Sequence, residues 1–183
     1  KIISKFMKKI NLISVRAKDL TKKQILLICK LKNSFWTRTV PDQLKWFKKN
    51  VKKMDINNML IIDGNVVGYT LLRRRSAYIE NRRISYFYFD TFLVRSDLRK
   101  KGLGETLMIF NNKIIKSFKR HSFLICKRKL ISFYVKFNWK ILPGIRFKMM
   151  DHKPAWLTIE SNVNGMNYNF NKKIKKKIIY YIN

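Results

Sequence analysis

The chain has 183 residues, 46% of them hydrophobic and 14% aromatic, which suits one globular domain with a sizeable core. No apolar run approaches the roughly 18 residues that a membrane span needs, and the opening residues lack the apolar core of a signal peptide. Two cysteines without paired spacing exclude a disulfide scaffold and a zinc site, so we expect an intracellular, reducing compartment, either the cytoplasm or the mitochondrial matrix.

The first part of the chain predicts a strand followed by two helices. Residues 10–15 have a strand pattern, and Thr21 and Gln24 have capping-box spacing ahead of an apolar helical stripe. Pro41 fits the opening turn of a second helix. A strongly basic flank accompanies that second helix, formed by Lys45, Lys48, Lys49, Lys52 and Lys53.

Three strands are predicted next. Residues 59–62 and 66–72 flank the turn Asp-Gly-Asn at 63–65, which is a strong hairpin signal. Residues 84–94 carry bulky side chains on both faces, as expected of a strand at the centre of a sheet that is covered on both sides. This central strand leads directly into the most informative segment of the chain.

That segment, 99–104, reads Arg-Lys-Lys-Gly-Leu-Gly and joins the central strand to a helical pattern that begins at Leu103. A helix N-terminus has unpaired N–H groups and partial positive charge, so it binds phosphate well. Gly102 and Gly104 allow an anion to approach closely, and the three basic residues add charge. The segment therefore predicts a site for a phosphate-bearing cofactor.

The spacing of this segment excludes two other phosphate loops. A dinucleotide-binding fingerprint needs a small residue where the chain has Leu107, and a P-loop needs a lysine after its second glycine, where the chain has Glu105 before Thr106. What remains is Arg-x-x-Gly-x-Gly at a strand-to-helix turn. The alternative is a chance pair of glycines in an exposed turn.

The rest of the chain alternates between helix and strand. Helical spacing is present at 103–118 and again at 130–137, with an apolar strand pattern at 122–126 between them. One or two strands follow from Lys140 onward, and His121 is expected in a surface turn. The predicted order of elements is therefore β-α-α-β-β-β-α-β-α-β-β.

We divide the chain into three parts on these patterns. Residues 1–9 form a basic N-terminal extension, residues 10–170 a single domain, and residues 171–183 a basic and aromatic C-terminal tail. In that tail Tyr180 and Tyr181 either stack on nucleic-acid bases or pack against the domain.

Two motifs resemble the GNAT superfamily of acyl-CoA N-acyltransferases. The pyrophosphate loop of that family reads Gln/Arg-x-x-Gly-x-Gly/Ala, as at 99–104, and its late helix, Ala-x-x-Leu-Tyr-x-Lys-x-Gly-Phe, is similar to residues 130–139. The order of elements over residues 10–150 is also that of the family. The resemblance implies an α/β fold with a mixed, mostly antiparallel central sheet of about six to seven strands and about four flanking helices.

The resemblance also implies acetyl-CoA or another acyl-CoA as cofactor, and a direct transfer without a metal ion. Departures from the family pattern are Lys127 in place of a common asparagine, Ser96 in place of proline and Asn138 in place of glycine. The pyrophosphate is expected on the amides of the loop and the pantetheine alongside the central strand. The implied cofactor-binding residues are Phe92, Leu93, Val94, Arg99, Lys100, Lys101, Gly102, Leu103, Gly104, Glu105 and Lys127.

Two residues are candidates for catalysis. Tyr134 occupies the position of the family tyrosine, whose phenol protonates the departing thiolate; its alternative role is that of a packed core tyrosine. The attacking amine must also lose a proton, and Asp90 on the central strand is the best placed candidate base. The alternative role of Asp90 is that of a structural, hydrogen-bonded carboxylate.

The second large signal is charge. The chain has 42 Lys and Arg residues against 10 Asp and Glu, and the net charge of +32 exceeds what the phosphates of one cofactor require. If the basic residues face outward, such a surface binds RNA or another polyanion at physiological salt. The densest clusters are Arg73, Arg74 and Arg75, then Arg82 and Arg83, Arg128 and Lys129, and Lys172, Lys173, Lys175, Lys176 and Lys177.

Two functions are therefore open. The first is an N-acetyltransferase that moves an acetyl group directly from acetyl-CoA to an amine acceptor. The second is a GNAT-fold, RNA-binding component of a large ribonucleoprotein, such as a mitochondrial ribosome, in which catalysis is lost. The loop and Tyr134 favour the enzyme, whereas the net charge of +32 and Lys127 favour the ribonucleoprotein. We place the enzyme first.

Overall fold

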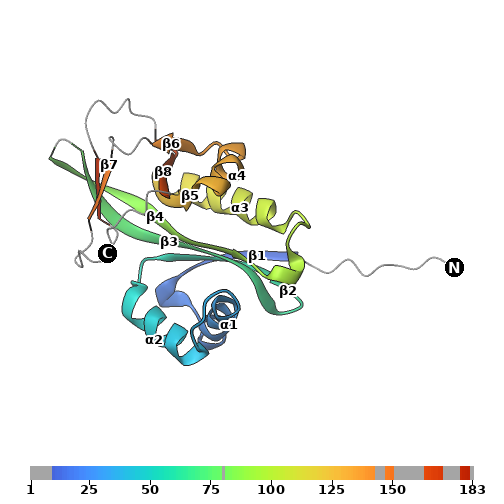
Figure 1. Cartoon of the computed structure of the whole chain (residues 1–183). Helices are drawn as coiled ribbons and strands as arrows, with labels where there is room; N and C mark the ends of the chain where they lie inside the picture. The colour runs from blue at the N-terminus through green and yellow to red at the C-terminus, as the bar shows by residue number, and fades with distance from the viewer. Residues whose placement is uncertain (1–9, 80, 143–146, 151–162, 171–177, 182–183) are drawn as a thin grey trace. The chain divides into compact units, whose positions relative to one another are not determined.

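A computed structural model describes residues 10–79, 81–142, 147–150, 163–170 and 178–181 (Figure 1). The helices are α1 (Lys22–Asn33), α2 (Val40–Asn50), α3 (Leu103–Ser117) and α4 (Ile131–Lys136). The strands are β1 (Ile10–Arg16), β2 (Ile56–Ile62), β3 (Asn65–Ile79), β4 (Arg82–Val94), β5 (Ser122–Lys127), β6 (Lys140–Leu142), β7 (Phe147–Met150), β8 (Val163–Tyr168) and β9 (Ile178–Tyr181). Short 3-10 helices lie at Ala17–Asp19, Ser96–Leu98 and Arg128–Leu130.

The strands form a mixed, mostly antiparallel sheet, which confirms the predicted fold class. They are hydrogen-bonded in the order β1-β2-β3-β4-β5-β8-β6, with β9 paired to β3 and β7 paired to β9. The pairs β4/β5 and β7/β9 are parallel, whereas β1/β2, β3/β9, β5/β8 and β6/β8 are antiparallel. Among the described residues the sheet has nine strands, more than predicted, because the C-terminal part of the chain adds several short ones.

The chain divides into two compact units, which are described separately below. Unit 1 consists of Lys1–Thr70 and Thr91–Leu107, and unit 2 of Leu71–Asp90 and Met108–Asn183. Strands β3 and β4 and helix α3 contribute residues to both units.

Local sequence rules define the turns of unit 1. The N–H of Gln24 donates to Thr21 Oγ1 at 3.1 Å, and the N–H of Thr21 donates back to Gln24 Oε1 at 2.9 Å, so the predicted capping box at the start of α1 is confirmed. Helix α2 begins with a second capping box and a proline in its first turn. The β2–β3 hairpin turns at Asp63 and Gly64, whose φ angles of 50° and 73° suit a two-residue type I′ turn.

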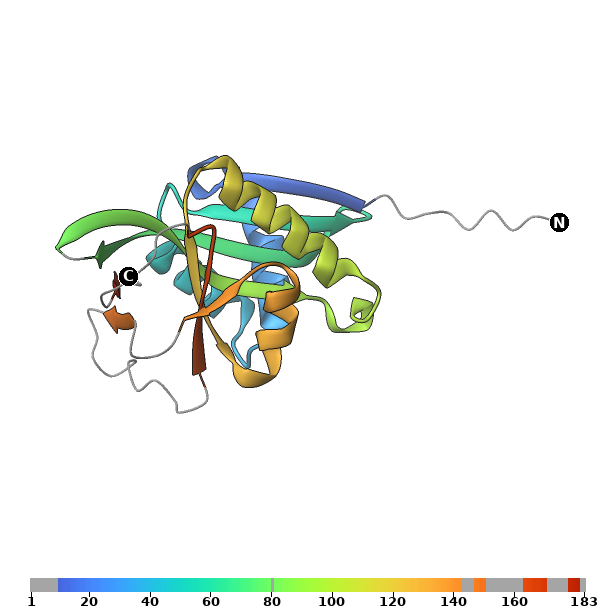
Figure 2. The same ribbon diagram turned by 90° about the horizontal axis from the view of Figure 1, so that it is seen from above.

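The core of unit 1 forms against its strands. Helices α1 and α2 lie on one face of β1 and β2 (Figure 1), and these two strands run side by side (Figure 2). Leu60, Val67 and Leu107 belong to one buried cluster. Gly68 is held in close contact there, because a Cβ on it would lie 3.1 Å from both Leu107 Cδ2 and Leu60 Cβ. This close packing fixes the start of α3 against β3.

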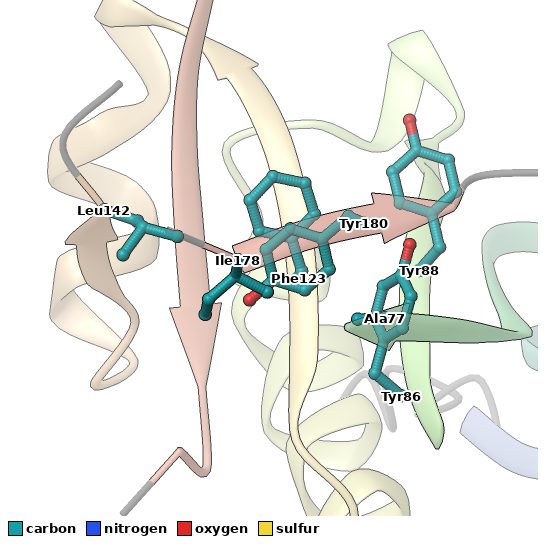
Figure 3. Packing of buried hydrophobic residues seen from close by; sticks show 7 residues of the cluster. All are labelled: Ala77, Tyr86, Tyr88, Phe123, Leu142, Ile178 and Tyr180. Atoms are coloured by element: carbon teal, nitrogen blue, oxygen red, sulfur yellow. The ribbon is translucent and has the colours of Figure 1, made fainter. Parts of the chain in front are cut away.

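Unit 2 is built around an aromatic cluster that includes residues of β3, β4, β5 and β9 (Figure 3). The rings of Phe123 and Tyr180 stack with centroids 4.0 Å apart, and Tyr86 meets Tyr180 edge-on at 4.9 Å. The hydroxyl of Tyr86 donates to the carbonyl oxygen of Tyr181 at 2.9 Å. Residues 178–181, within the predicted tail, therefore form a strand of the sheet, and Tyr180 packs in the core instead of stacking on bases.

His121 lies beside this cluster and is only 9% exposed. Its ring stacks on Tyr86 at 5.6 Å and contacts Phe170 at 4.9 Å between centroids. Burial, with a smaller contribution from Arg120, lowers the pKa of His121 from 6.5 to about 4, so the imidazole is neutral at physiological pH. The predicted surface turn is wrong, because the carbonyl of His121 accepts from the N–H of Phe87 at 3.0 Å and so joins the sheet.

Candidate functional site

The loop between β4 and α3 lies in unit 1 and has the predicted position. Strand β4 ends at Val94 and α3 begins at Leu103. Lys100 and Gly102 adopt left-handed φ angles of 59° and 76°, which turn the chain into the helix. The N–H of Thr106 donates to the carbonyl of Gly102 at 3.0 Å. The N–H groups of the turn before Thr106 therefore lie at the helix N-terminus, where the helix itself supplies no acceptor.

The two glycines of the loop serve different purposes. Gly102 needs the conformational freedom of glycine at its φ of 76°, although nothing lies within 4 Å of its missing Cβ. A Cβ on Gly104 would lie 3.8 Å from Phe92 Cζ and 4.0 Å from Val94 Cγ2, which are ordinary contact distances. Packing inside the protein therefore does not require glycine at 104. The first turn of α3 presents bare backbone at the positive end of its dipole, which fits a diphosphate.

Charged side chains surround this turn. Arg99, Lys100 and Lys101 are exposed, whereas Leu103 is buried and anchors the start of α3. Glu105 is also exposed, in the first helical turn where the dipole favours a carboxylate. The loop thus combines open backbone with positive charge, as a phosphate site requires, and phosphate binding itself stays a prediction.

The last residues of β4 bring the predicted pantetheine contacts next to the loop. Leu93 and Val94 are buried, whereas Phe92 is half-buried. The carbonyl of Val94 accepts a hydrogen bond from Arg99 Nε at 3.3 Å. Because the side chains of Leu93 and Val94 are buried, we expect these two residues to contact a pantetheine arm mainly through their main chain.

Tyr134 lies in α4 of unit 2, within the helix predicted from its spacing. Its side chain is buried, and its ring centroid lies 6.3 Å from that of Phe89 and 6.0 Å from that of Trp139. Burial, and to a lesser extent the nearby thiol of Cys126, raises the pKa of the phenol well above its ordinary value. The hydroxyl therefore stays protonated at physiological pH, which is the state that a proton donor needs.

Helix α4 is held by residues that the sequence analysis missed. The indole Nε1 of Trp139 donates to Asn112 Oδ1 at 3.1 Å, and Asn112 Nδ2 donates to the carbonyl of Phe137 at 3.0 Å. The N–H of Trp139 donates to the carbonyl of Tyr134 at 3.2 Å. Asn112 is a buried amide of α3 at helical spacing with the buried residues Met108 and Ile115. An asparagine at helical spacing with apolar residues is the sequence signal that could have indicated this contact, because buried amides need partners.

Asp90 lies on β4 in unit 2 and pairs with Arg73 of β3. The distance between Arg73 Nη1 and Asp90 Oδ2 is 3.2 Å, and the two side chains are 8% and 21% exposed. A buried arginine needs a partner for its charge, so this pair favours the structural role of Asp90. The base role of Asp90 stays a prediction.

No protein-family model matches the sequence. Solved structures do match it. An acyl-CoA N-acyltransferase from Pseudomonas aeruginosa has a TM-score of 0.64 at 14% identity, over 87% of this chain and 99% of its own. The GNAT family N-acetyltransferase YhbS from Escherichia coli, in complex with CoA, has a TM-score of 0.65 at 12% identity, over 94% and 90%. Arabidopsis thaliana Naa50, in complex with a bisubstrate analogue, has a TM-score of 0.57 at 17% identity, over 88% and 99%. The chain has the GNAT fold.

The GNAT fold is the fold that the resemblance of the two motifs implied. The described elements follow the predicted order as far as α4. Residues 99–104 lie between β4 and α3, and residues 131–136 form the late helix. The two motifs therefore occupy the expected elements of a GNAT fold, one in each unit.

The basic clusters predicted to face nucleic acid lie partly inside this GNAT fold. Arg73 and Arg75 are buried, so the condition that the basic residues face outward is not met at these two positions. Side chains alternate along a strand, and the two buried arginines share the face opposite to that of Arg74. Residues 172–177 lie outside the described residues. The predicted basic residues that are exposed are Arg74, Arg82, Arg83, Arg128 and Lys129.

Lys127 is exposed at the end of β5. No group of three or more His, Cys, Asp and Glu side chains that could hold a metal ion occurs within the part of the chain that the structure describes. None of the helices among those residues is both long enough and apolar enough to cross a membrane.

Proposed function

We propose that the chain is an acyl-CoA-dependent N-acetyltransferase that moves an acetyl group directly from acetyl-CoA to an amine. The observation that carries the proposal is the turn into α3, where bare backbone at Gly104 meets the exposed basic residues 99–101. The GNAT fold supports it, because YhbS, which shares the fold, was solved in complex with CoA.

The residues present fit the phosphates of an acyl-CoA. The main-chain N–H groups of the first turn of α3 would hold the diphosphate, together with the side chains of Arg99, Lys100 and Lys101. Acetyl-CoA, when bound, supplies a thioester carbonyl that an amine can attack. The backbone of Phe92, Leu93 and Val94 adjoins the loop and is the proposed guide for the pantetheine arm.

Tyr134 is the proposed proton donor. Its raised pKa keeps the phenol in the OH form, so it can donate a hydrogen bond to negative charge that develops on the leaving sulfur. The anchoring of α4 through Trp139 and Asn112 holds the hydroxyl in one place. Asp90 remains the candidate base for the proton of the amine, against the structural role that its pair with Arg73 favours.

Cofactor binding is tested by titrating acetyl-CoA into the wild type and Gly104→Glu. A carboxylate at this point repels phosphate and fills the bare first turn, so only the wild type should bind. Ile109→Glu is a matched control, because it places the same charge at an exposed position of the same helix, where the side chain is 60% exposed. Equal affinity of the wild type and Gly104→Glu would remove the proposed phosphate site.

The acid role is tested by Tyr134→Phe. Loss of a general acid typically lowers the rate by about 100-fold or more, so acetyl transfer to a panel of amines should fall by that factor. Acetyl-CoA affinity and thermal stability should stay near those of the wild type, because the ring is retained. An unchanged rate would exclude Tyr134 as the acid.

A second candidate function, RNA binding within a large ribonucleoprotein such as a mitochondrial ribosome, is favoured by the outer face of α2. Lys45, Lys48 and Lys49 are exposed at helical spacing, and Lys52 and Lys53 continue the series beyond the helix. Like charges three and four residues apart destabilise a helix. An anionic partner on this face would remove that cost.

RNA retention measured across salt concentrations tests this candidate. Binding through this face should weaken steeply with salt, and replacing Lys45, Lys48 and Lys49 by glutamine should make the slope less negative by about two to three units. The same replacement at the exposed residues Lys22, Lys23 and Lys30 of α1 is the matched control. Absent or salt-independent binding, or a native protein that never sediments with a large particle, would exclude this role.

A further inference from the structure

Phe35 lies in the connection between α1 and α2 of unit 1, and its half-buried ring meets the first residue of the phosphate loop. The guanidinium carbon of Arg99 is 4.8 Å from the centroid of the Phe35 ring. Arg99 Nε donates to the carbonyl of Val94 at 3.3 Å. Phe35 is itself fixed, because its N–H donates to the carbonyl of Lys32 at 3.0 Å at the end of α1. The guanidinium of Arg99 is therefore held by a contact with an aromatic ring and by a hydrogen bond from Nε to the main chain.

Together these contacts restrict the orientation of the guanidinium. A guanidinium is flat and has five N–H donors in a fixed fork, so a ring beside its carbon and a hydrogen bond at Nε limit where its other donors lie. The Nη groups remain as donors for a charged ligand. Because Arg99 is exposed, an unsupported side chain would lose rotamer freedom on binding an anion, and these two contacts remove part of that cost in advance.

We infer that Phe35 is a positioning residue for phosphate binding, which holds the Arg99 guanidinium ready for the diphosphate of an acyl-CoA. The inference rests on the proposed function and deepens it, because it adds a residue outside the loop motif. It also couples the connection between α1 and α2 to the phosphate loop. A ligand that engages Arg99 should stabilise Phe35, and a change at Phe35 should alter the affinity for that ligand by the same linkage.

A double-mutant cycle with CoA as the probe tests this coupling. Phe35→Leu should weaken CoA binding by about three- to tenfold, as expected for loss of a cation–π contact at a partly exposed site. In an Arg99→Gln background the same substitution should have no further effect. Phe35→Tyr, which keeps an aromatic face, should restore wild-type affinity.

Trp46→Leu is the matched control, because it also removes an aromatic ring from a cation–π contact of unit 1, in which the ammonium of Lys32 lies 3.6 Å from the centroid of the Trp46 ring. It should leave CoA affinity unchanged. Amide exchange gives an independent readout that needs no variant at Phe35: CoA should slow exchange at residues 34–38 in the wild type but not in Arg99→Gln.

Two outcomes would overturn the inference alone. One is that Phe35→Leu weakens CoA binding by the same factor in the wild type and in the Arg99→Gln background. The other is that CoA binds to the wild type but does not change amide exchange at residues 34–38. A wild type that binds no CoA at all would overturn the proposed function and this inference with it.

Discussion

The loop before α3 in unit 1 and the aromatic cluster around β9 in unit 2 differ in what their side chains touch. In the loop, basic side chains are exposed, and a Cβ on Gly104 would meet only ordinary contacts. In the cluster, Phe123 and Tyr180 are buried and stacked on each other, and His121 is buried beside them. Substitutions in the loop should therefore change ligand binding with little effect on folding, whereas substitutions in the cluster should change the stability of unit 2.

The largest expected effect is at Tyr180. Tyr180→Ala removes a fully buried ring that stacks on Phe123, and loss of such a ring typically costs about 3–5 kcal/mol of unfolding free energy. Tyr180→Phe should instead be neutral or stabilising, because the hydroxyl is buried without a hydrogen-bond partner among the described residues. Urea denaturation measures both changes. A strongly destabilised Tyr180→Phe would show that the hydroxyl contributes to folding.

The next effect is the pH dependence of stability at His121. The pKa of His121 is about 4 in the folded protein and 6.5 in the unfolded chain. At a pH between these two values the unfolded chain therefore binds more protons at this residue than the folded protein does. Stability from this group is therefore complete above about pH 6.5 and is lost as the pH falls toward 4, by roughly 3 kcal/mol in total.

His121→Phe isolates that contribution, because it keeps an aromatic ring and removes the titrating group. Denaturation at several pH values should show a smaller loss of stability between pH 6.5 and 4 in the variant than in the wild type. Parallel curves would mean that another group causes the loss.

The smallest effects compare the two glycines of the loop. Gly102→Ala should destabilise the protein by about 1 kcal/mol, because its φ of 76° strains an L residue. Gly104→Ala should be neutral or slightly stabilising, because alanine favours helix and its Cβ meets no close contact. Thermal melting measures the change in stability of each variant, and a CoA titration measures its affinity for CoA. A Gly104→Ala variant that melts like the wild type but binds CoA more weakly would sharpen the contrast with the cluster.

Elements defined by short-range rules could be predicted from the sequence. The capping box at Thr21 and Gln24, the turn at 63–65 and the glycine loop at 99–104 each depend on residues a few positions apart. Their geometry follows from backbone preferences that act locally. The element order that identified the fold was accessible for the same reason.

Features that depend on pairing between distant residues could not be predicted. The alternation of side chains along a strand indicates that Arg73 and Arg75 share a face of β3. That Arg73 forms an ion pair with Asp90 follows only from the pairing of β3 with β4, which brings the two residues together. The sequence around His121 predicts a surface turn, because nothing near it in the sequence indicates that the rings of Tyr86 and Phe170 contact it. Asn112 could be noticed as a polar residue at helical spacing with Met108 and Ile115, but its partners Trp139 and Phe137 could not be named.

Strand β9 has a consequence for how the protein is made. Tyr180 pairs with Ala77, about 100 residues earlier in the chain, so β3 emerges from the ribosome long before its partner strand is translated. Until then the outer end of β3 is an open edge that can pair with another nascent chain. Unit 2 can therefore be completed only after β9 has been synthesised, and slower elongation between β3 and β9 lengthens the interval in which this edge is open to misassembly.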